Sequence, residues 1–101
     1  MRIEFYSSEK LKKEIVSIIG KYLDLSQHRI FFFGSRVSGK GNERSDIDVG
    51  IEGTEEISWQ VVAKIKEDNE NLPILYKIDI VDFKKVSSDF YSVAKQDIEM
   101  I

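Results

Sequence analysis

The chain has 101 residues, of which 42% are hydrophobic and 33% are charged, and its formal net charge is −3. This composition predicts one soluble globular domain over residues 1–101, and the acidic balance argues against unspecific binding to nucleic acid, which needs a dense cationic surface. No apolar run approaches the roughly 20 residues that would span a membrane. The amino terminus lacks the apolar stretch of a signal peptide and there is no cysteine, so a cytoplasmic location without disulfides or thiolate metal sites is expected.

The first 40 residues are predicted to form two helices around one buried strand. Apolar residues recur at helical spacing over residues 8–23, with Ser7 or Ser8 as the N-cap. Residues 29–33 are apolar on both faces, which indicates a strand covered by helices. A short second helix is expected to begin near Val37.

Two further strands are predicted on either side of a third helix. Residues 46–52 and 76–81 alternate between apolar and polar positions, which is typical of strands with one buried face. The helix between them is expected over residues 55–68, with Thr54 as its cap. Trp59 lies off the apolar stripe of this helix; it could stack on a base or face a partner, but packing at the margin is favoured.

A last helix is expected over residues 87–96, burying Phe90, Val93 and Ala94. The tail, residues 98–101, is open between an edge strand and a contact with a partner. The predicted fold class is α/β (α+β), a small mixed sheet of three to four strands flanked by helices, in the order α-β-α-β-α-β-α.

Three aspartates are the candidate catalytic and metal-binding residues, Asp46, Asp48 and Asp79. Asp46 and Asp48 lie two residues apart on a predicted strand, so both side chains project from one face, and Asp79 has the same alternation on another strand. Such carboxylates suit one or two Mg²⁺ ions, which also bind water and substrate phosphates. The alternative is an acidic solvent face. Asp82 competes with Asp79 but is interpreted as the cap of a turn.

The turn Gly34-Ser35 lies between the first predicted strand and the aspartates. Glycine lets the backbone approach an oxyanion closely, and a serine hydroxyl together with the first amides of a helix can hold phosphate oxygens. Arg36 and Lys40 could also contact phosphates, although exposed loop cations are usually just solvated. The alternative is an ordinary turn from strand to helix with Ser35 as the cap, which leaves the aspartates unexplained.

The spacing of these residues resembles the signature of the DNA polymerase beta-like nucleotidyltransferase superfamily, and within it the minimal nucleotidyltransferases of bacteria and archaea. That signature is Gly-Ser, a glycine four residues after the serine, Ser-Asp-x-Asp, and a third aspartate on a later strand. It maps without insertion or deletion onto Gly34, Ser35, Gly39, Ser45, Asp46, Asp48 and Asp79. Ser38 departs from it, since many relatives carry an arginine there.

The resemblance implies a nucleotidyltransferase fold and Mg²⁺-dependent transfer of a nucleoside monophosphate, AMP from ATP, to a hydroxyl. Asp46, Asp48 and Asp79 would be catalytic and hold the metal. The nucleotide would be bound by residues of the loop, namely Gly34, Ser35, Arg36, Gly39 and Ser45. The resemblance also implies a HEPN-type helical partner encoded alongside, often a ribonuclease toxin. The chain would be its antitoxin, acting by binding it, by adding AMP to it, or both.

Other functions stay open at this stage. The chain could be a binding module that neutralises its partner by masking it, without catalysis. It could also transfer nucleotides to a small molecule, as aminoglycoside nucleotidyltransferases do, whereas DNA synthesis is disfavoured by the acidic chain. The acceptor hydroxyl would be presented by another chain or by a second copy of this one, so a homo-oligomer is possible.

Overall fold

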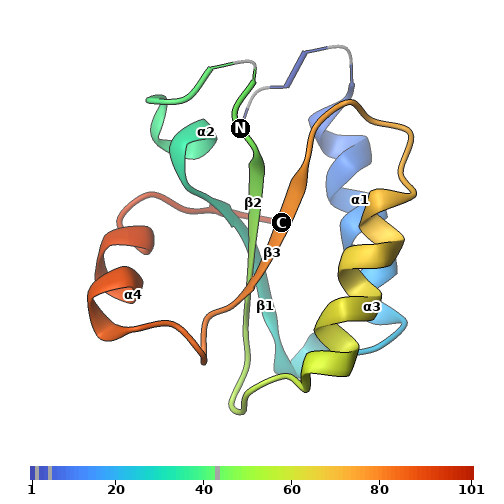
Figure 1. Ribbon diagram of the computed structural model, residues 1–101, viewed down its shortest axis with the longest axis vertical. Helices are drawn as coiled ribbons and strands as arrows, with labels where there is room; N and C mark the ends of the chain where they lie inside the picture. The colour runs from blue at the N-terminus through green and yellow to red at the C-terminus, as the bar shows by residue number, and fades with distance from the viewer. Residues whose placement is uncertain (2, 5, 43) are drawn as a thin grey trace.

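The computed structural model describes residues 1, 3–4, 6–42 and 44–101. The described residues form helices on both sides of a four-stranded sheet, with the strands in the order β3-β2-β1-β4. Figure 1 shows how these elements are arranged. In chain order they are α1 (Ser8–Gly20), the short 3-10 helix η1 (Leu25–Gln27), β1 (Arg29–Phe33), α2 (Ser35–Ser38), β2 (Ile47–Glu52), α3 (Trp59–Glu70), β3 (Ile78–Asp82), α4 (Ser88–Ala94) and β4 (Glu99–Met100).

The sheet is mixed, as the sequence predicted. β1 runs antiparallel to β2 and β4, whereas β2 and β3 are parallel neighbours. The tail prediction is resolved in favour of an edge strand, because β4 pairs with β1 at Phe31 and Phe32. The parallel pairing sets Asp48 directly beside Asp79.

One face of the sheet is closed by α1 and α3, which lie side by side (Figure 1). Among the described residues, the buried members of its core are aliphatic apart from Phe32, and they come mainly from the two helices and from alternate positions of the strands. The buried members are Leu11, Ile15, Ile18, Ile19, Ile30, Phe32, Ile47, Val49, Ile51, Ile57, Ile65 and Ile80. Burial of this many large side chains is the main stabilising term of the fold.

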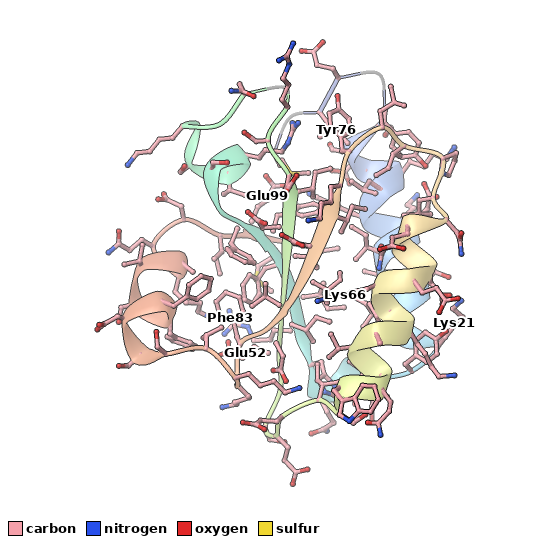
Figure 2. All side chains as sticks on the ribbon, in the orientation of Figure 1. Lys21, Glu52, Lys66, Tyr76, Phe83 and Glu99 are labelled. Carbon is pink, nitrogen blue, oxygen red and sulfur yellow. The ribbon has the colours of Figure 1, made fainter. Side chains whose placement is uncertain are left out.

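The other face carries α4 and a smaller aromatic core. Phe31, Phe33 and Phe83 are buried there, and their rings meet edge to face with centroids 4.8 to 6.3 Å apart. Figure 2 shows Phe83 and Glu52 on the side of the sheet that faces α4. Since alternate residues of β1 enter the two cores, the strand is apolar on both faces, as its sequence indicated.

The third helix begins later than predicted. It starts at Trp59 and not at residue 55, and its cap is Ser58, whose hydroxyl accepts from the amide of Val61 at 3.3 Å, and not Thr54. The reason is a long-range contact: the amide of Ile57 donates to the buried carboxylate of Asp82 at 2.7 Å. This bond holds the preceding segment outside the helix.

Two predictions about side chains were wrong, namely the packing of Trp59 at the margin of the core and the burial of Phe90 and Val93. Trp59 is 71% exposed on the first turn of α3, and Phe90 and Val93 of α4 are 43% and 69% exposed. α4 spans Ser88–Ala94 and turns a different side to the sheet, because Tyr91 packs against the aromatic core and bonds to Glu52. Of the three residues predicted to be buried, Ala94 packs against this core, and the partly exposed Phe90 ring meets Phe33 and Phe83 edge to face.

The amino-terminal helix and the turn after β3 agree better with expectation. α1 is capped by Ser7, whose hydroxyl accepts from the amide of Lys10 at 3.2 Å, although it ends at Gly20, short of residue 23. Asp82 accepts from the amide of Lys84 at 2.9 Å and therefore caps a turn, as interpreted. Among the residues that the structure describes, no helix is both long enough and apolar enough to cross a membrane.

Candidate active site

Asp48 and Asp79 are brought together by the pairing of β2 with β3. They are direct partners in the parallel register, so their side chains leave the sheet on the same side. Asp46 lies just before β2 and is exposed, close enough for its charge to act on Asp48. The three predicted aspartates therefore share one end of the sheet, with Asp48 at the centre.

The carboxylate of Asp48 lies close to other negative charges. Partial burial, and then the charges of Asp79 and Asp46, raise its pKa to about 6. Within the described residues, no three acidic, histidine or cysteine side chains are close enough to hold a metal ion by themselves. The predicted three-aspartate cluster is thus only partly assembled, as a close pair with Asp46 at its margin.

These residues fit a hard divalent cation. The donors are carboxylate oxygens, and a bound cation would offset the repulsion of Asp48 by Asp79 and Asp46, which together with burial raises the pKa of Asp48. Mg²⁺ is usually held by one or two carboxylates together with water and substrate phosphates, so a complete protein cage is not required. Asp46, Asp48 and Asp79 are the residues that would hold it.

The glycine turn after β1 lies against Asp48. Gly34 has φ 84° and ψ −162°, a conformation that side chains rarely adopt, and a Cβ there would lie 2.2 Å from Oδ2 of Asp48. Only glycine lets the backbone pass this close to the carboxylate. The carbonyl of Gly34 then accepts from the amides of Val37 and Ser38, which begins the single turn of α2.

In the loop that follows, Gly41 lies close to the hydroxyls of Ser35 and Ser45. A Cβ on Gly41 would lie 2.8 Å from Oγ of Ser35 and 2.9 Å from Oγ of Ser45, so its lack of a side chain lets the two serines approach each other. The hydroxyl of Ser45 accepts from the amide of Asn42, and the amide of Gly41 donates to the carbonyl of Ser35. Gly39 ends α2 at φ 82°, with open space around it.

Arg36 ties the loop to neighbouring segments. Its Nε donates to the carbonyl of Ser45 at 2.7 Å, and its guanidinium lies 4.5 Å from the centroid of the Tyr76 ring. Figure 2 shows Tyr76 at the end of the sheet where this loop lies. The arginine therefore positions the serine that precedes Asp46, and a direct role in nucleotide binding stays a prediction.

A pocket of about 440 Å³ opens beside this turn. Gly34, Ser35 and Asp48 line one part of it, together with Ser38 and Lys40 of the loop. The opposite part is formed by α4 and the residues after it. The pocket therefore brings the polar residues of the turn and loop, together with Asp48, next to the apolar side chains of α4.

Several contributors to the site were not found from sequence. The spacing placed Gly34, Ser35, Asp48 and Asp79 together, and the structure does bring them together. Gly41, Tyr76 and the α4 residues of the pocket were missed. Gly41 could have been suspected as a second glycine in the loop, but nothing local in the sequence shows that Tyr76 and α4 approach it.

The chain is similar to one curated protein whose activity is named. It shares 26% identity with the probable protein adenylyltransferase MntA of Haemophilus influenzae, over 88 residues that cover 85% of this chain and 77% of the relative.

Solved structures of low sequence identity share the fold. A chain of a toxin–antitoxin complex with AMP-PNP gives a TM-score of 0.64 at 17% identity, covering 88% of this chain and 70% of that one. A mutant of the toxin–antitoxin complex MntA–HpeT gives 0.71 at 13% identity, with coverage of 88% and 70%. A tri-AMPylated Shewanella oneidensis HEPN toxin in complex with the MNT antitoxin gives 0.64 at 14% identity, with coverage of 93% and 71%.

The family itself is shown by a match over most of the chain. Residues 13–101 match the family model described as polymerase beta, nucleotidyltransferase. This range contains the glycine-serine turn, the loop and all three aspartates. The chain belongs to the polymerase beta nucleotidyltransferase family.

Proposed function

We propose that the chain is a Mg²⁺-dependent nucleotidyltransferase that moves AMP from ATP to a hydroxyl of a HEPN-type partner protein, and that it thereby acts as an antitoxin. The observation that carries the proposal is the approach of the Gly34 turn to Asp48, with Asp79 paired beside that aspartate. Such an arrangement puts a phosphate-holding turn next to carboxylates that need a cation.

The loop residues would hold the triphosphate. The hydroxyl of Ser35 and the first amides of α2 offer donors to the β- and γ-phosphates, and Lys40 lines the same pocket with a positive charge. Gly34 keeps this turn close to Asp48. Asp46, Asp48 and Asp79 would hold Mg²⁺, whose charge offsets that of the carboxylates and of the phosphates.

The transfer is a displacement at the α-phosphorus. The acceptor hydroxyl oxygen forms a bond to that phosphorus, the bond from the phosphorus to the oxygen that bridges to the β-phosphate breaks, and pyrophosphate leaves. The hydroxyl proton passes to a carboxylate, and Asp79 takes this role because it lies beside Asp48 on the edge strand β3. The chain's contribution is to hold the reacting groups in line.

The relatives support a protein as the acceptor. The curated relative is named as a protein adenylyltransferase, and one structural neighbour is an antitoxin in complex with an AMPylated HEPN toxin. A HEPN-type partner is therefore the acceptor to test first. Neutralisation by complex formation alone is the competing explanation.

The test uses the purified chain, the candidate partner, Mg²⁺ and each nucleoside triphosphate in turn, with the intact mass of both proteins as the readout. We expect the partner to gain one or more AMP units with ATP, and the gain to vanish with Asp46→Asn and with chelation of Mg²⁺. If the partner forms a stable complex but neither protein gains mass, the proposed transfer is wrong and masking is the function. A gain on this chain alone would point to self-modification.

A further inference from the structure

The pocket beside Asp48 has an apolar wall that the transfer chemistry leaves unused. Phe90, Val93 and Ala94 of α4 line it, although the first two are largely exposed to solvent. Exposed aromatic and branched side chains beside a catalytic pair are a site for a ligand with an apolar face.

The wall is held firmly in place against the sheet. The Phe90 ring meets Phe33 and Phe83 edge to face at centroid distances of 6.0 and 5.9 Å. Below it, Glu52 accepts hydrogen bonds from the Tyr91 hydroxyl and from Nζ of Lys95. These contacts fix the side of α4 that is turned toward the pocket.

Glu52 is ionised to perform this task. Burial alone would raise its pKa, but the hydrogen bonds from Lys95 and Tyr91, together with the charges of Lys95 and Arg29, outweigh burial and hold the pKa below its ordinary value. The bonds to α4 are therefore charge-assisted at neutral pH.

Two polar residues beside the apolar wall also line the pocket. Gln96 and Asp97, which follow α4, line it. Within the described part of the chain, neither side chain has a hydrogen-bond partner of its own. One offers an amide and the other a carboxylate to whatever fills the pocket.

We propose that this part of the pocket binds the nucleobase of the substrate, and that Phe90, Val93 and Asp97 determine which base is accepted. The inference rests on the proposed function. Phe90 and Val93 contact the face of the base, and the carboxylate of Asp97 accepts from an exocyclic amino group. Adenine has such a group and uracil does not, so ATP is bound in preference to UTP.

A nucleotide matches the pocket better than a segment of a partner protein does. Its triphosphate is anionic and its base is flat and aromatic, and the lining of the pocket includes the hydroxyl of Ser35, the positive charge of Lys40 and the ring of Phe90. The volume of about 440 Å³ lies within the roughly 300–1,000 Å³ of small-molecule sites.

The first test is the affinity for a non-hydrolysable analogue, adenosine 5′-(α,β-methylene)triphosphate with Mg²⁺, measured by calorimetry. Loss of stacking in Phe90→Ala should weaken binding about tenfold, and Val93→Ser should weaken it less. Leu75→Ala, which truncates an apolar residue that is 94% exposed and outside this pocket, is the matched control and should bind as wild type does. Inorganic tripolyphosphate, which has no base, should bind equally to all four proteins.

The second test is base selection. Asp97→Asn replaces an acceptor-only group by one that also donates, so the preference for the ATP analogue over the UTP analogue should shrink severalfold while tripolyphosphate binding stays unchanged. A purely structural role of Asp97 would weaken both analogues alike. Equal weakening would overturn its part in the inference.

The outcomes separate this inference from the proposed function. If wild type binds the ATP analogue and Phe90→Ala binds it equally well, the base lies elsewhere and the inference is wrong while the proposed function stands. If Phe90→Ala instead weakens only the complex with the partner, α4 is a protein-docking surface. If wild type binds neither the analogues nor tripolyphosphate, both proposals fail.

Discussion

The two faces of the sheet are built from the same strands but have different roles. One face forms the main core, and the other carries the candidate active site. In β2, Ile47, Val49 and Ile51 enter the closed face under α1 and α3 and are fully buried, whereas Asp48 and Glu52 project to the other side. Among the described residues, the fully buried side chains of the closed face are aliphatic except for Phe32. The α4 face combines a small aromatic core with carboxylates and an open pocket. Stability and chemistry are thus separated by the two-residue period of a strand.

Substitutions on the two faces should differ most in their effect on the rate of AMP transfer to the partner. Asp48→Asn removes the central carboxylate but leaves the aliphatic core intact, so transfer should fall by about a thousandfold or more, because cation and phosphate positioning supply several kcal/mol of the barrier reduction. The measurement is the initial rate of AMP incorporation into the partner. Full activity in this variant would remove Asp48 from the site.

A substitution on the closed face should have the converse effect, lowering stability but not the transfer rate. Ile15→Ala truncates a fully buried side chain and should lower the free energy of unfolding by about 3 kcal/mol, while the transfer rate per folded molecule is retained. Urea denaturation measures the first quantity. Val93→Ala on the open face is the control, with an expected change within about 0.5 kcal/mol.

Gly34 affects both the stability of the fold and the candidate active site. Its backbone has a positive φ, and it passes close to the carboxylate of Asp48. Gly34→Ala should lower stability by about 2 kcal/mol, from strain at positive φ and from the clash with the carboxylate, and should also abolish transfer. Gly39→Ala meets the same strain in open space, and about 1 kcal/mol is expected there. Equal losses in the two variants would show that the contact with Asp48 is unimportant.

The smallest expected effect is the loss of folding stability caused by the negative charge of Asp48 beside Asp46 and Asp79. The pKa of Asp48 is raised in the folded protein, so ionisation disfavours folding and stability falls as pH rises from about 4 to about 6. Without divalent ions, Asp48→Asn should therefore be more stable than wild type at pH 8 by about 1 kcal/mol, since solvent screens much of the effect. The gain should disappear below pH 4.

Added Mg²⁺ should affect the stability of wild type and of Asp48→Asn differently. It should raise the melting temperature of wild type at pH 8, because an ion bound only to the folded state stabilises it, and should do so much less for Asp48→Asn. If Mg²⁺ stabilised both proteins equally, the ion would bind elsewhere.

The sequence predicted those features that depend on local pattern. Alternation in β2 and β3 put Asp48 and Asp79 on the same kind of face, and the spacing from Gly34 identified the turn beside them. The start of α3 could not be predicted, because it depends on the bond between the Ile57 amide and Asp82, which are 25 residues apart. The exposure of Phe90 was missed for a similar reason. The hydrogen bonds from Tyr91 and Lys95 to Glu52, which is distant in the sequence, fix the side of α4 that packs against the sheet.

The most direct test of the division between the faces is a map of amide chemical-shift changes on adding the Mg²⁺-bound, non-hydrolysable ATP analogue. The largest shifts should fall at Gly34, Ser35, Asp48 and Phe90, with those at Ile15 and Ile65 close to zero. Shifts centred on α1 and α3 instead would contradict the assignment of the α4 face as the catalytic one.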